Sequence, residues 1–64
     1  MSSALTYATA RVWVQTAHES EGYALEKAHR GVYLSAWHEA AHARHSMEMA
    51  AIYALVWLLG GSDV

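Results

Sequence analysis

The chain of 64 residues contains no cysteine, no proline and no phenylalanine. Without cysteine it can form neither a disulfide bond nor a thiolate zinc site, and nothing indicates an oxidising compartment. Without proline it lacks the residue that most strongly interrupts a helix. A chain of this size has a thin core, so the devices left to stabilise it are oligomerisation and metal binding through nitrogen and oxygen ligands.

Positive charge is also scarce. The basic residues are Arg11, Lys27, Arg30 and Arg44, which form no cluster along the sequence, and the net charge is −2 with histidine neutral. Proteins bind nucleic acids largely by neutralising phosphates with basic side chains. We therefore expect no nucleic-acid partner.

Long apolar runs are absent as well. The most apolar run, 49–59, would extend about 16 Å as a helix, which is roughly half the hydrocarbon thickness of a bilayer. Residues 1–4 lack the basic and apolar regions of a secretory signal. We therefore expect no membrane span and a cytoplasmic location.

What the chain does contain favours helices. Alanine is abundant, hydrophobic residues make up 55% of the sequence, and apolar residues recur at helical intervals. These features predict a single all-α domain over 1–64, folded as an antiparallel two-helix hairpin. The first helix is expected at about 4–30 and the second at about 33–59.

Glycines mark the expected helix ends. Arg30 followed by Gly31 is typical of a helix C-terminus, with a cation in the last turn and then a residue that tolerates left-handed geometry. Gly60 and Gly61 are expected to end the second helix in the same way. Gly22 weakens the middle of the first helix by about 1 kcal/mol relative to alanine, which allows a kink there.

The second helix is apolar on every side. One stripe consists of Leu34, Trp37, Ala41, His45, Glu48, Ile52, Leu55 and Leu59. The opposite side carries alanines with Met47 and Leu58. Because a helix that is apolar all round must be buried, and a two-helix chain cannot bury it alone, we expect the hairpin to form a homo-oligomeric bundle. The interface residues predicted from this pattern are Trp37, Met49, Ile52, Leu55, Val56 and Leu59.

Histidine and glutamate supply the only pattern that suggests chemistry. The segment from His38 to His42 fits H-E-x-x-H, in which two histidines one turn apart bind zinc and the glutamate acts as general base. The longer form of that motif, which continues with x-x-G-x-x-H, does not fit this chain. We therefore do not expect a peptidase.

A second interpretation of the same residues is that they form a metal site inside a helical bundle. In the first helix, Glu19 and Glu26 lie on one stripe with Leu5 and Val12, and this stripe is expected to face inward. Antiparallel pairing would then place Glu26 near His38 and Glu19 near His45. The candidate metal ligands are Glu19, Glu26, His29, His38, His42 and His45.

Two E-x-x-H units, Glu26 to His29 and Glu39 to His42, carry a family resemblance. The pattern resembles the di-iron carboxylate proteins of the ferritin-like kind, including short two-helix forms that complete their site by dimerising. The resemblance implies iron, or zinc, held by carboxylates and imidazoles. It departs from that family because Glu19 and Glu26 lie on one helix and Glu39 is expected to point away from the core centre.

The same inward residues can also be explained without metal. Glutamate and histidine can pair as a polar layer that fixes the register or the oligomer number. The chain offers no cysteine nucleophile, no G-x-S-x-G serine and no phosphate-binding glycine loop. We expect a small non-enzymatic helical module that self-associates and binds a protein partner. The alternative is a metal-binding bundle of the zinc or di-iron type.

Overall fold

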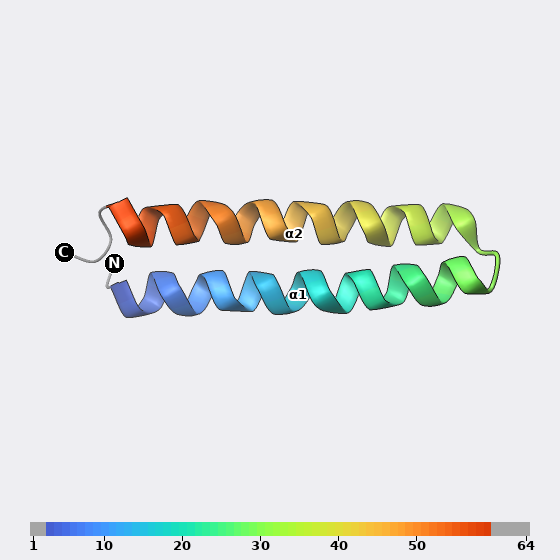
Figure 1. The fold of residues 1–64 in the computed structure, drawn as a ribbon, viewed down its shortest axis with the longest axis horizontal. Coiled ribbons are helices and arrows are strands. Elements are labelled where there is room, and N and C mark those ends of the chain that lie inside the picture. Colours follow the sequence, from blue (N-terminus) through green and yellow to red (C-terminus); the bar gives the residue numbers. More distant parts are fainter. Residues whose placement is uncertain (1–2, 60–64) are drawn as a thin grey trace.

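The computed structural model describes residues 3–59, which form two helices of 27 residues each, α1 over Ser3–His29 and α2 over Tyr33–Leu59. The helices lie side by side and antiparallel, and the chain extends 48 × 13 × 12 Å (Figure 1). The predicted all-α hairpin is confirmed. No helix within residues 3–59 is both long enough and apolar enough to span a membrane.

A three-residue turn centred on Gly31 reverses the chain. Gly31 has φ 79°, the left-handed conformation that glycine adopts without a Cβ clash. The Val32 amide donates to the Lys27 carbonyl at 2.9 Å, and the Gly31 amide donates to the Ala28 carbonyl at 3.0 Å. This pair of bonds is a Schellman motif, which satisfies carbonyls at the end of α1. The Val32 carbonyl then accepts the first hydrogen bond of α2, from the Ala36 amide.

The sequence also suggests a kink at Gly22 and a helix end at Gly60 and Gly61. The helix α1 is continuous from Ser3–His29, so Gly22 causes no break in it. A Cβ at Gly22 would have nothing within 4 Å, which shows that no close packing requires glycine there. The predicted helix stop at Gly60 and Gly61 lies outside the described residues.

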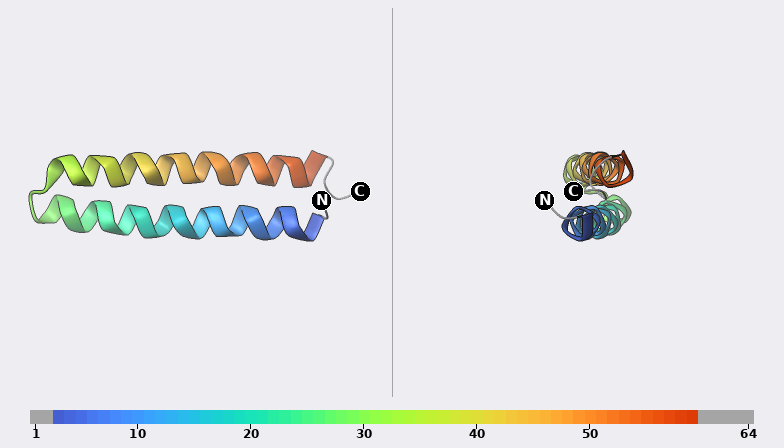
Figure 2. Two further views of the ribbon diagram at one scale, coloured as in Figure 1. Left: turned by 180° about the vertical axis from the view of Figure 1, so that it is seen from behind. Right: turned by 90° about the vertical axis from the view of Figure 1, so that its left-hand side faces the viewer.

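Small side chains fill the contact between the two helices. The buried residues are Thr6, Ala17, Ser20, Ala36, Ser46 and Ala50. On each helix they belong to a row of residues with alternating three- and four-residue spacing. This repeat keeps the same side of a helix facing its partner helix, and we name the contact between the two rows the seam. In the end-on view the two helices cross gradually along their length (Figure 2). A seam of alanine and serine lets two helix backbones approach closely.

The inward stripes expected from the sequence are therefore wrong for the single hairpin. Val12, which was expected to face inward, is 62% exposed, and Glu19 and Glu26 are exposed as well. On α2 the side that packs against α1 is the alanine side, while Ile52 and Leu55 are each 53% exposed. The physical reason is size, because large side chains on the seam would hold the helices apart and leave the alanines unpacked.

Candidate functional site

Most large apolar side chains of α2 point away from α1. We name six of them the outer face of α2: Leu34, Trp37, Ile52, Leu55, Val56 and Leu59. Their exposed fractions run from 48% for Val56 to 83% for Leu59. At 100° per residue they lie opposite the buried Ala36 and Ala50. A large exposed apolar patch of this kind marks an interaction surface.

The outer face contains five of the six residues that the sequence predicts for an interface. The sixth, Met49, is half-buried. All five exposed side chains are therefore available to another chain. At the open end of the hairpin, the rings of Tyr7 and Trp57 meet at a centroid distance of 5.5 Å, which joins the two helices there.

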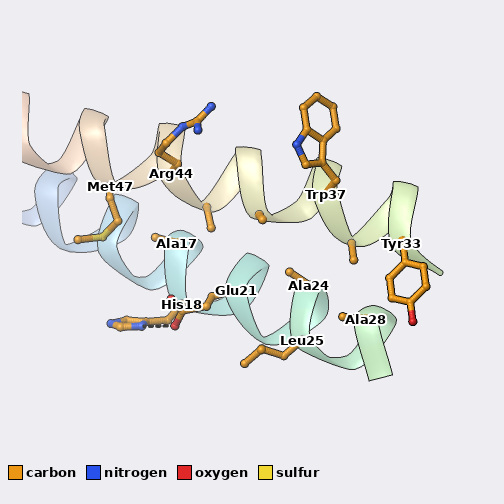
Figure 3. Close-up of a pocket in the computed structure, with 13 residues that line it drawn as sticks. Ala17, His18, Glu21, Ala24, Leu25, Ala28, Tyr33, Trp37, Arg44 and Met47 are labelled. Carbon is orange, nitrogen blue, oxygen red and sulfur yellow. Dashed lines mark ion pairs between the residues drawn. The ribbon is translucent and has the colours of Figure 1, made fainter. Parts of the chain in front are cut away.

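A groove of about 650 Å³ runs between the helices on one side of the seam (Figure 3). Its alanine lining comes from both helices and consists of Ala17, Ala24, Ala28, Ala36, Ala40 and Ala43. Tyr33 and Trp37 border it on α2, and Glu21 and Arg44 add one charge on each helix. The groove is thus rich in alanine and bordered by aromatic rings near the turn.

Polar contacts join the helices elsewhere along the seam. Ser20 Oγ and His42 Nδ1 are 2.7 Å apart, within hydrogen-bonding distance. Lys27 Nζ donates to Glu39 Oε2 at 2.9 Å, and both side chains are partly buried. Glu39 therefore contacts α1, and the expectation that it points away from the core centre is wrong. These contacts fix the register between α1 and α2.

The candidate metal ligands on α1 are directed to other partners or to solvent. Arg30 Nη2, in the turn that follows α1, donates to Glu26 Oε1 in the last turn of that helix at 2.6 Å. Glu19 and His29 are exposed. The expected convergence of Glu19 and Glu26 with the histidines of α2 inside one hairpin is not observed.

The three histidines on α2 are all exposed, and each has a neighbour. His42 contacts Ser20, as described above, and the rings of His45 and Trp13 meet edge to face at 6.2 Å. The His38 ring lies 5.1 Å from the Trp37 ring. Within residues 3–59, no three histidine, aspartate or glutamate side chains gather closely enough to hold a metal ion.

Sequence reasoning missed the residues that hold the helices together. The signal was present as alanine at every seventh position, at Ala10, Ala17 and Ala24 in α1 and again at Ala36, Ala43 and Ala50 in α2. A seven-residue repeat of small side chains predicts a close helix pair as directly as a repeat of large ones.

Known proteins offer no guide to this surface. Comparisons with protein families, with curated proteins and with solved structures find no match for the chain. The function proposed below therefore rests on the residues and their geometry.

Proposed function

We propose that this chain is a small non-enzymatic helical interaction module that self-associates through the outer face of α2 and also binds a protein partner. The observation that supports it is that the small side chains are buried and the large apolar side chains are exposed. Alanine, serine and threonine are buried between the helices, whereas Ile52, Leu55 and Leu59 are exposed. Exposed leucine and isoleucine at this density favour contact with another chain.

The hairpin seam is too small to hold a chain of this length folded by itself. The only buried hydrophobic side chains among the described residues are Ala17, Ala36 and Ala50. Burial of one methyl-sized group contributes about 0.8 kcal/mol, whereas ordering one backbone residue costs about 1–2 kcal/mol. Contact with another chain would supply additional apolar burial, and α2 holds the side chains that can provide it.

The accessible surface of the chain leads to the same inference. The chain exposes 4690 Å², whereas a compact monomer of 7.1 kDa exposes roughly 4100 Å². The excess of about 600 Å² reflects the elongated shape of the hairpin. An elongated hairpin with this excess is suited to pack along its length against another helical chain.

The groove beside Tyr33 and Trp37 supports the partner-binding part of the proposal. Its alanine lining leaves room for the larger side chains of an incoming amphipathic helix. Tyrosine and tryptophan are enriched among the residues that dominate binding at interfaces. We therefore place the protein partner at the Tyr33 end of this alanine-rich groove, and we assign Trp37 to the self-association surface.

A matched pair of variants tests the self-association. Ile52→Glu puts a charge on the outer face of α2, and Val12→Glu puts the same charge on a similarly exposed aliphatic position of α1. An unpaired charge buried in an interface costs several kcal/mol, on the order of 3–5 kcal/mol. Light scattering at micromolar concentration should show that Ile52→Glu dissociates the assembly and Val12→Glu does not. Equal behaviour of the two variants would contradict the assignment of the outer face.

A further inference from the structure

Two charged residues of α2 have no ion-pair partner within residues 3–59. The third charged residue of that helix, Glu39, is held by Lys27. Arg44 and Glu48 are both exposed, and neither forms an ion pair with any residue of the described range 3–59. Figure 3 shows the Arg44 and Trp37 side chains directed away from α1, so both are accessible to another chain.

Arg44 and Glu48 are placed symmetrically on α2. The helix spans Tyr33–Leu59, so Ser46 is its midpoint and the two charges stand two residues before it and two after it. In two identical helices packed antiparallel and in full overlap, positions equally distant from the midpoint face each other. Arg44 of one copy would then meet Glu48 of the other, twice in each dimer.

Other pairs obey the same symmetry. Trp37 and Leu55 each lie nine residues from Ser46, and Ala41 and Ala51 each lie five residues from it. Together with Arg44 and Glu48 they form one row with alternating four- and three-residue spacing, which is a single stripe along a helix. The stripe therefore combines an aromatic–aliphatic pair near each end, small residues between, and opposite charges beside the centre.

We infer that α2 packs antiparallel against α2 of a second copy of this chain, about a two-fold axis that passes between the two α2 helices at the level of Ser46. This inference rests on the proposed self-association and names its helix, its direction and its register. In this arrangement Arg44 pairs with Glu48 of the second copy, and Trp37 packs on Leu55 of the second copy. The opposite helix dipoles of an antiparallel pair also attract.

The parallel alternative lacks this complementarity. Two α2 helices in parallel and in register would bring Arg44 against Arg44 and Glu48 against Glu48, and like charges directly opposed destabilise an interface. The antiparallel pair replaces both repulsions with attractions. Charge therefore selects the direction of the pairing, and the isologous contact closes the assembly at this surface.

Charge reversal tests the pairing. Arg44→Glu and Glu48→Arg should each raise the dimer dissociation constant, on the order of tenfold, because two attractive pairs become two repulsive pairs. An equimolar mixture of the two variants should form a heterodimer of near wild-type affinity, since every facing pair is then opposite in charge. Sedimentation of each variant and of the mixture gives these values, measured at concentrations where circular dichroism shows that each variant is helical.

Cross-linking tests the register in a chain that has no cysteine of its own. Ala41→Cys mixed with Ala51→Cys should form a disulfide-linked heterodimer under mild oxidation, whereas either variant alone should cross-link weakly. Homodimers of Ala41→Cys alone would show parallel pairing and overturn the inference.

Different results would contradict the antiparallel α2 pairing and the self-association on which it rests. A wild-type chain that associates, but whose charge-reversal variants associate equally well, would overturn the α2 pairing and leave the self-association standing. A folded wild-type monomer would overturn both.

Discussion

Lys27 Nζ on α1 lies 2.9 Å from Glu39 Oε2 on α2, close to the turn that joins the helices. Both residues occupy seam positions, where their neighbours are alanine and serine, and their side chains are 30% and 28% exposed. The pair is thus an ion pair between helices at the edge of a small core. It fixes the register at the turn, where no large apolar side chain does so.

A double-mutant cycle should measure this pair. Lys27→Met, Glu39→Gln and the double variant remove the charges singly and together while keeping side-chain length. Because both side chains retain partial solvent contact, we expect a coupling of about 0.5–1 kcal/mol in urea unfolding. A coupling indistinguishable from zero would show that the ion pair does not stabilise the hairpin.

The two described glycines should respond oppositely to alanine. Gly31→Ala should destabilise the chain by about 1–2 kcal/mol, because a Cβ is unfavourable at the left-handed φ of 79°. Gly22→Ala should stabilise it by about 1 kcal/mol, because Gly22 is helical and exposed and its surroundings are open. Thermal unfolding measures both changes, and a loss of stability in Gly22→Ala would contradict the continuous α1 helix.

Two buried serines offer a second contrasting pair. Ser46 Oγ is fully buried and has no hydrogen-bond partner among residues 3–59, whereas Ser20 Oγ lies 2.7 Å from His42 Nδ1. Ser46→Ala should therefore stabilise the chain by about 1 kcal/mol, because it removes a buried unsatisfied hydroxyl. Ser20→Ala should destabilise it by a similar amount, about 1 kcal/mol, because it removes a bond. Equal effects of the two substitutions would contradict the different environments of these hydroxyls.

The sequence predicts the elements of this fold well, because the relevant signals are local. Helix-forming composition, the absence of proline and the Arg30-Gly31 end signal depend only on neighbouring residues, and the structure forms α1, the turn and α2 accordingly. Which side of each helix faces the other is not a local property. It depends on how closely two backbones can approach, and the seven-residue alanine repeats determine that.

The side of each helix that faces the other also determines where the candidate metal ligands lie, and the sequence did not predict that side. Glu19, Glu26 and His45 were expected to meet inside the bundle because each shares a stripe of its own helix with large apolar residues. That stripe faces outward in the hairpin, so the carboxylates are exposed and Glu26 pairs with Arg30. Large apolar residues predict burial, but they do not determine whether the surface that buries them belongs to the same chain or to another one.

The metal-binding hypothesis makes a separate prediction about the three exposed histidines of α2. If His38, His42 and His45 bind zinc or iron between copies, added Zn²⁺ should raise the melting temperature, by mass action, and chelator should reverse the rise. His42→Ala should abolish the metal-dependent part, while His18→Ala, at an exposed histidine of α1 outside the candidate ligand set, serves as the matched control. Elemental analysis without stoichiometric metal, together with unchanged melting, would end this hypothesis.

The central claim is that this chain folds in association with a second copy, with α2 at the contact. Sedimentation equilibrium of the wild-type chain at micromolar concentration, with helicity measured on the same samples, tests it most directly. The account predicts a mass of at least twice 7.1 kDa and a loss of helicity on dilution as the assembly dissociates. A fully helical species of 7.1 kDa whose melting temperature does not change with concentration would contradict it.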